Sequence, residues 1–317
     1  MSREERSRRG DLAGRIAWLY FIKGHTQREI SDMLGLSRMQ VQRSISKSRA
    51  TGLVRIKIDD PLIGCFEKED KLKERFSLSD AVVSVTPRDE EGLKKTLGEA
   101  AARYLLRKLE KNQVVGVGWG TTLKEITKFL PRRPLAQCHV VSLIGGWTKK
   151  ADENSYEVAW KLADALSVEC YYISAPAVAD SARSRSIIAS EKSVNRALEM
   201  ARRSDLAVVG IGNASEDCSL VKAGFLSPEE VRRLRSLGAA GDVCGHFYDK
   251  EGVPVNSGYA ERVIGVGLDE LRKIRTVIGV AGGVGKVDAI HGALKGGYVN
   301  VLITDEETAG RLLVSEE

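Results

Sequence analysis

The chain has 317 residues, 43% hydrophobic and 29% charged, a balance typical of a soluble globular protein. No apolar run approaches the roughly 20 residues of a membrane span, and the arginine-rich start lacks the apolar segment of a signal peptide, so we expect a cytoplasmic protein. Five scattered cysteines without a C-x-x-C pair, beside only four histidines, indicate neither a disulfide framework nor a metal site, and we expect no cofactor.

The basic charge is confined to the start of the chain. Residues 1–58 contain 13 Lys/Arg and 5 Asp/Glu, a net charge of +8, whereas the other 259 residues contain 36 and 38, a net charge of −2. A solvated basic tail would explain residues 1–10 alone, but apolar periodicity begins at Asp11. We therefore predict a nucleic-acid-binding domain over residues 1–58 and a larger domain over residues 59–317.

Local signals predict three helices in the basic region. A first helix from near Asp11 has apolar residues at helical spacing: Ile16, Leu19 and Tyr20. The capping box Thr26–Glu29 begins a second helix at Gln27, which ends at Gly35. Ser37 caps a third helix running to about Ala50, with Val41 and Ile45 on its inner face. Two short helices joined by a glycine turn are typical of a helix-turn-helix.

The outer face of the third predicted helix carries the chemistry for reading DNA. It holds Arg38, Met39, Gln42, Arg43 and Lys47. Arginine pairs with guanine and glutamine with adenine in the major groove, while Lys47, with Arg49, is placed to contact phosphates. Residues 53–58 alternate apolar and basic side chains, which predicts the strand of a small wing. Three-helix modules that bind proteins have a similar pattern, but the local charge favours double-stranded DNA as the partner.

From about residue 66 the pattern changes to alternating strands and helices. Strands are predicted over residues 81–85, 113–118, 139–143, 169–173, 206–211, 276–280 and 298–303. The main helices are predicted over 93–109, 122–129, 153–166, 187–203 and 287–294, and capping boxes over 227–230 and 304–307. This alternation predicts an α/β fold with a parallel, Rossmann-like sheet that binds ligands at the carboxyl ends of its strands.

The first glycine-rich turn, "VVGVGWGTTL", places Gly116, Gly118 and Gly120 before two threonines. A dinucleotide fingerprint needs glycine where Thr121 stands, so that motif is absent. The hydroxyls of Thr121 and Thr122 at a helix start suit a phosphate, although many such turns only cap a helix.

The second glycine-rich turn, "VIGVAGGVGKV", resembles a nucleotide-binding P-loop but fails both of its tests. Val280 replaces the required glycine, and Val287 replaces the Ser or Thr that holds magnesium. The glycines and Lys286 still suit a phosphorylated ligand, the alternative being a lysine at a solvated helix start.

The motifs together resemble the SorC family of bacterial transcriptional regulators. The helix-turn-helix "TQREISDMLGLSRMQVQRSISKSRATGLVRI" is followed in the family's order by "VVGVGWGTTL", "VSLIGG", "SDLAVVGIGN", "GAAGDVCGHFYD" and "VIGVAGGVGKVDAIHGALKGGYVNVLITDEETA". The resemblance implies a winged helix-turn-helix joined to an effector domain similar to sugar-phosphate isomerases and deaminases. It also implies a homo-oligomer, usually a tetramer, and a phosphorylated sugar or polyol as effector.

The resemblance also implies site residues. The family's phosphate-contacting loop corresponds here to Gly118, Gly120, Thr121 and Thr122. The lysine that helps close the phosphate site corresponds to Lys286, which follows Gly282 and Gly283. The acidic residue that lies against sugar hydroxyls corresponds to Asp242, and a further glycine loop of the pocket corresponds to Gly145 and Gly146. We therefore expect a sequence-specific regulator of carbohydrate-metabolism genes and not an enzyme. One alternative is a sugar-phosphate isomerase or deaminase with a DNA-binding head. In such an enzyme Asp242 would be the base, but the sequence shows no evident histidine partner for it. The other alternative is an oligomerisation scaffold with a vestigial pocket.

Overall fold

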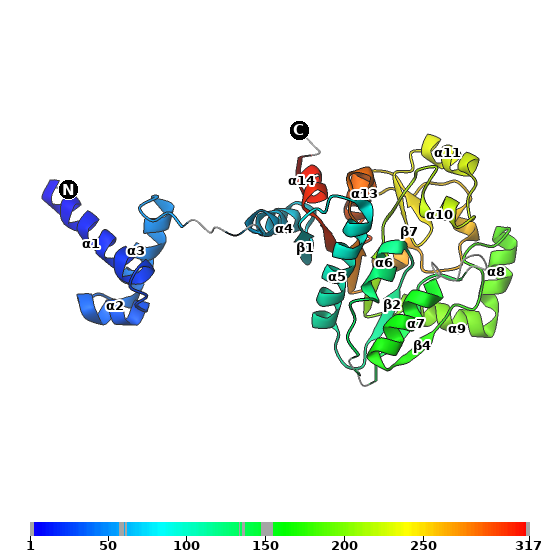
Figure 1. The fold of residues 1–317 in the computed structure, drawn as a ribbon, viewed down its shortest axis with the longest axis horizontal. Coiled ribbons are helices and arrows are strands. Elements are labelled where there is room, and N and C mark those ends of the chain that lie inside the picture. Colours follow the sequence, from blue (N-terminus) through cyan, green and yellow to red (C-terminus); the bar gives the residue numbers. More distant parts are fainter. Residues whose placement is uncertain are drawn as a thin grey trace. The chain divides into compact units, whose positions relative to one another are not determined.

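The computed structural model describes residues 3–56, 60, 62–132, 134, 137–146 and 155–314. The chain divides into two compact units, residues 1–60 and 61–317. Each unit is described by itself below (Figure 1). Among the described helices, none is long and apolar enough to cross a membrane.

Unit 1 contains three helices: α1 (Arg3–Phe21), α2 (Gln27–Leu34) and α3 (Arg38–Ala50). Thr26 and Ser37 cap α2 and α3 through complete capping boxes, and Gly35 ends α2 in the left-handed conformation at φ 63°. These predictions are confirmed, and so is the inner face of α3, because Val41 and Ile45 are buried in a core with α1 and α2. The first helix begins earlier than Asp11, at Arg3.

The predicted wing strand is not present over residues 53–56, which follow a turn after α3 and form no ladder. Residues 57 and 58 of that prediction lie outside the described part of the chain. The backbone N–H of Val54 instead donates to the carbonyl of Ser48, 3.0 Å away, which folds this segment back on the end of α3. The alternation of apolar and basic side chains over residues 53–58 was therefore too short to specify a strand.

Unit 2 is built on a parallel sheet of seven strands in the order β1-β10-β9-β5-β2-β3-β4, with a small antiparallel sheet β6-β7-β8. The strands are β1 (Asp80–Ser84), β2 (Val114–Val117), β3 (His139–Ser142), β4 (Glu169–Tyr171), β5 (Leu206–Gly210), β6 (Gly212–Asn213), β7 (Gly241–Val243), β8 (His246–Tyr248), β9 (Thr276–Val280) and β10 (Val301–Asp305). The helices are α4 (Ile63–Phe76), α5 (Glu90–Lys108), α6 (Thr121–Ile126), α7 (Ser155–Leu166), α8 (Ala182–Ser190), α9 (Lys192–Arg202), α10 (Ser219–Lys222), α11 (Pro228–Ser236), α12 (Leu268–Leu271), α13 (Val287–Lys295) and α14 (Glu306–Val314), with 3-10 turns η2 (Ala260–Arg262) and η3 (Val284–Lys286).

Helices cover both faces of the parallel sheet, as predicted. Alternate residues of one strand belong to two different cores: Val208 packs with α5, α6 and α7, whereas its neighbour Val209 packs with α4, α9, α13 and α14. Ile278 and Val277 divide in the same way. Since successive side chains of a strand point to opposite faces, both faces must be apolar, which explains the continuous apolar runs in the sequence.

Two predicted elements are corrected by the structure. The helix predicted over 187–203 is two helices, α8 and α9, because Glu191 has an extended backbone with ψ 132° between them. The capping box predicted over 304–307 is wrong, since β10 continues through Thr304 and the carboxylate of Asp305 caps α14 by accepting from the Thr308 N–H at 3.1 Å. The capping box Ser227–Glu230 is confirmed.

We predict that a fragment of residues 60–317 folds without unit 1. The core of unit 1 consists only of its own residues, and the three cores of unit 2 contain only residues from Cys65 onward. The fragment should therefore unfold cooperatively within about 4 °C of the matching transition of the full chain, a shift that corresponds to about 1 kcal/mol for a domain of this size. Calorimetry and near-ultraviolet circular dichroism measure this. A fragment without near-ultraviolet signal would show that unit 2 depends on unit 1.

Candidate functional sites

A crevice opens in unit 2 at the carboxyl ends of β2, β5 and β9. From β2 the chain continues outward to β3 and β4, and it then returns to the other side of β2 with β5, so the strand order reverses between β2 and β5. In open parallel sheets, such a switch point is where ligands bind. The residues lining the crevice include Gly120, Thr121, Thr122, Asn213, Asp242 and Lys286.

The turn after β2 presents two hydroxyls to this crevice. Gly120 has φ 137°, a conformation that other residues rarely adopt, and it directly precedes α6. Helix geometry leaves the N–H groups of Thr121 and Thr122 without partners inside α6. Because α6 has only six residues, its dipole is small. Any attraction of this turn for an anion therefore comes mainly from the hydroxyls and N–H groups as hydrogen-bond donors.

The second glycine turn brings Lys286 into the same crevice. The Lys286 Nζ donates a hydrogen bond of 3.0 Å to the carbonyl of Ile211, the residue directly after β5. Burial lowers the pKa of Lys286, and the nearby carboxylate of Asp242 opposes that shift. The structure therefore places a partly desolvated cation opposite Thr121 and Thr122, which come from a distant part of the sequence.

Asp242 lies at the buried end of the crevice, on β7. Its side chain is 5% exposed and accepts a hydrogen bond of 3.1 Å from the Gly245 N–H. Burial raises the pKa of Asp242 to about 6, although the Gly245 hydrogen bond and the charge of Lys286 act in the opposite direction. Gly212 makes room for this carboxylate, because a Cβ there would lie 2.1 Å from Asp242 Oδ1.

Several predicted glycines have packing roles. Gly118, Gly145 and Gly146 are not among the described residues that line the crevice. A Cβ at position 145 would lie 2.5 Å from the Ala175 carbonyl oxygen, and one at position 146 would lie 2.4 Å from the Tyr156 ring. Gly282 and Gly283 do line the outer part of the crevice. Trp147 and Thr148, left without a role by the sequence, lie outside the described residues.

Sequence reasoning assigned no role to Asn213, which lines the crevice. The Asn213 Nδ2 donates to the Gly285 carbonyl at 3.3 Å, and its Oδ1 accepts from the Ser215 hydroxyl at 3.1 Å. A polar residue shortly after the predicted buried strand over residues 206–211 was the available signal. Within the described chain, no cluster of three or more His, Cys, Asp or Glu side chains could hold a metal ion.

In unit 1, the residues predicted to read DNA share one exposed face of α3. Arg38, Met39, Gln42, Arg43 and Lys47 are all exposed, while Val41 and Ile45 on the opposite face are buried. Arg49 is also exposed, but its guanidinium stacks over the Phe21 ring at 5.1 Å. An exposed helix with this polar face has the form of a recognition helix.

Known proteins of related sequence and structure define the family. A family model described as "Putative sugar-binding domain" matches residues 60–314. The erythritol catabolism regulatory protein EryD of Brucella abortus is 33% identical over 305 residues, covering 95% of this chain and 96% of that protein. The crystal structure of the full-length sorbitol operon regulator SorC from Klebsiella pneumoniae matches with a TM-score of 0.76 and 31% identity, covering 96% of this chain and 98% of that one. The chain belongs to the SorC family of transcriptional regulators.

Other relatives of the SorC family agree along nearly the whole chain. The deoxyribonucleoside regulator of Bacillus subtilis is 32% identical over 308 residues, which is 96% of this chain and 97% of that protein. The chain is thus a sugar-responsive transcriptional regulator built from a helical DNA-binding region and an α/β sugar-binding domain, as the sequence motifs predicted. The matched relatives are named as regulators and not as enzymes.

We predict that Asp242→Asn changes how stability depends on pH. The folded state holds the proton of Asp242 up to about pH 6, whereas the unfolded state releases it near the ordinary value of 3.8, so ionising Asp242 destabilises the fold as pH rises. The stability of the wild type relative to Asp242→Asn should therefore fall by up to about 3 kcal/mol between pH 4 and pH 7.5. Urea unfolding at several pH values measures this difference. Asp288→Asn, at an exposed position, is the control, and a difference independent of pH would contradict the expected ionisation.

Proposed function

We propose that this chain controls carbohydrate-metabolism genes by binding operator DNA through α3 and a phosphorylated sugar or polyol through the crevice of unit 2. The observation that carries the proposal is that Lys286, the threonines of the turn after β2 and the buried Asp242 all line one crevice. A cation with hydroxyl and N–H donors suits a phosphate, and a carboxylate accepts hydrogen bonds from sugar hydroxyls. The ligand class follows from the presence of both kinds of group in one crevice.

The proposed mechanism is a two-state one. The effector binds one arrangement of the regulator more tightly than the other, and the two arrangements differ in operator affinity. We propose no catalytic step for Asp242, because the described residues that line the crevice include no histidine to act as its acid–base partner.

We further propose that the regulator acts as a homo-oligomer, expected to be a tetramer. The support for this proposal is the family to which the chain belongs, since the resemblance implies a homo-oligomer. Sedimentation velocity gives the mass of the assembly.

The experiment for the DNA-binding part uses an operator selected from random-sequence DNA by the purified protein. Arg38→Ala or Arg43→Ala should weaken operator binding by about 1–3 kcal/mol while leaving most of the binding to random DNA, because a base contact discriminates sequences. Lys47→Ala is the contrast: as a phosphate contact, it should weaken both by a similar factor and reduce the salt dependence. Equal losses on operator and random DNA for the arginines would make them phosphate contacts as well.

The experiment for the effector part follows the change in operator affinity as tetritol, pentose and hexose monophosphates are added. Lys286→Ala should weaken the response to the active compound by about 1.5–3 kcal/mol, the range for a hydrogen bond to a charged group, and leave operator binding without effector unchanged. Lys192→Ala removes the same charge away from the crevice and is the control. An unphosphorylated sugar of equal potency, or an unshifted Lys286→Ala curve, would refute the phosphate site.

A further inference from the structure

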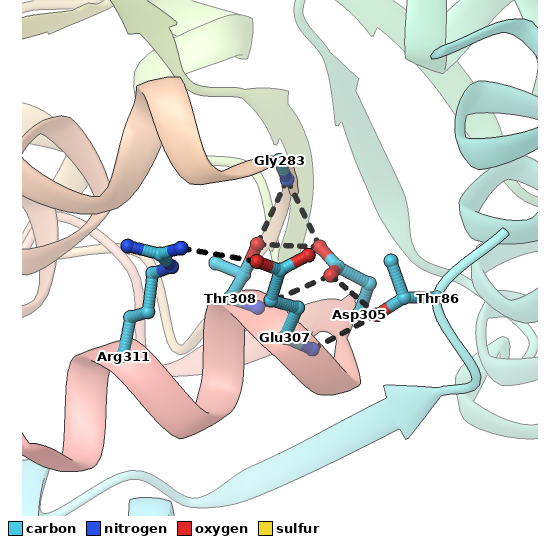
Figure 2. Close-up of polar contacts among 6 residues, drawn as sticks. All are labelled: Thr86, Gly283, Asp305, Glu307, Thr308 and Arg311. Atoms are coloured by element: carbon cyan, nitrogen blue, oxygen red, sulfur yellow. Dashed lines mark hydrogen bonds and ion pairs between the residues drawn. The ribbon is translucent and has the colours of Figure 1, made fainter. Parts of the chain in front are cut away.

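A buried carboxylate beneath the second glycine turn has no role in the function proposed so far. Asp305, at the end of β10, is completely buried and accepts four hydrogen bonds (Figure 2). The donors are the Thr86 hydroxyl at 2.8 Å, the Gly283 N–H at 2.9 Å, and the N–H and hydroxyl of Thr308. Burial alone would raise the pKa of Asp305, but the hydrogen bonds from Thr308, Gly283 and Thr86 outweigh it and lower the pKa below its ordinary value.

This carboxylate determines the shape of the glycine turn. The Gly283 N–H is shared between Asp305 Oδ2 and the Thr308 hydroxyl, at 2.9 and 2.8 Å, and so it faces away from any ligand of Lys286. A Cβ at position 282 would lie 2.4 Å from Asp305 Oδ2, and Gly283 has φ 96°. Position 282 therefore has no room for a side chain beside Asp305, and the backbone of position 283 favours glycine. The sequence indicated only that these glycines suit a phosphorylated ligand, whereas the structure shows the Gly283 N–H bonded within the protein.

The turn transmits this constraint to Lys286. The Gly283 carbonyl accepts from the Lys286 N–H at 2.9 Å and closes η3, which contains Lys286. On the opposite side, Asn213 holds the Gly285 carbonyl. The backbone around Lys286 is thus held by contacts that lead to Asp305 on one side and Asn213 on the other.

Thr86 joins the same network to the rim of the crevice. Its hydroxyl donates to Asp305 and accepts from the Glu307 N–H at 2.9 Å, while Arg311 pairs with the Glu307 carboxylate at 3.1 Å (Figure 2). Capping of α14 by Asp305 needs only the Thr308 N–H. The hydroxyl of Thr308, which contacts both Asp305 and Gly283, has no part in the cap and points to a second role.

We propose that Asp305, Thr308 and Thr86 are positioning residues that hold the turn of residues 282–286 in the shape that presents Lys286 to the anionic group of the effector. The proposal rests on the proposed function and deepens it. A turn fixed before the ligand arrives lowers the entropy lost on binding, so loosening it weakens anion binding without touching the ligand.

The experiment compares two threonines near the end of β10. Thr308→Val keeps the shape of the side chain but removes the hydroxyl that joins Asp305 to Gly283. Thr304→Val is the matched control, because the Thr304 hydroxyl is buried with no hydrogen-bond partner in the described structure. Thr308→Ser restores the hydroxyl, and Thr86→Val tests the same network from the segment after β1 should Thr308→Val fail to fold.

Two readouts are used. Hydrogen exchange of ligand-free protein should become faster in peptides covering residues 281–290 for Thr308→Val, but not for Thr304→Val. The sugar-phosphate concentration for half-maximal response should rise roughly tenfold for Thr308→Val, which corresponds to one lost hydrogen bond. It should return to within about twofold of wild type for Thr308→Ser, with operator affinity in the absence of effector unchanged throughout.

The outcomes separate the two proposals. A wild type that responds to no sugar phosphate would refute the proposed function, and the exchange data would still test the network. Unchanged exchange in Thr308→Val would overturn the positioning role. Faster exchange with an unshifted response would also overturn it, since the held turn would then be irrelevant to anion binding.

Discussion

The reversal of strand order between β2 and β5 is the constraint on which the site depends. It places the turn after β2 beside the ends of β5 and β9, so that Thr122 and Lys286 meet although they are far apart in the sequence. No covering helix crosses a switch point, and the polar ends of neighbouring strands are left facing a crevice. The threonines and the lysine assigned to the phosphate come from turns that this reversal brings together, whereas Asp242 comes from β7 of the antiparallel sheet.

Burial gives these groups their chemical character. Asp242 and Lys286 are both desolvated, which raises the pKa of one and lowers that of the other, while each favours the charged form of its neighbour. Buried charges seldom repay their desolvation, so this pair is a weak source of stability. The proposed effector, whose charge and hydroxyls would replace the lost water, gives the pair a function.

The sequence predicted what depends on neighbouring residues. Thr26, Gly35 and Ser37 set the limits of α2 and α3 through contacts within a few residues, and the apolar runs of the parallel strands follow from burial on both faces. Roles that depend on distant contacts were not predictable. The Tyr156 ring packed beside Gly146 is one such contact. The cap of α14 is another, because Thr304 belongs to β10 and Asp305 caps the helix instead.

The contrast between Thr304 and Asp305 shows how one strand end serves two purposes. Among the described residues, the Thr304 hydroxyl is buried without a partner, which is unfavourable, whereas Asp305 accepts from the segment after β1, from the glycine turn and from α14. Because those donors come from three separate segments, the carboxylate can be satisfied only when all three are in place. Because Asp305 is fully buried and ionised, the folded state must keep these hydrogen bonds, and they fix the rim of the crevice. The turn that carries Lys286 is therefore held in place before any ligand binds.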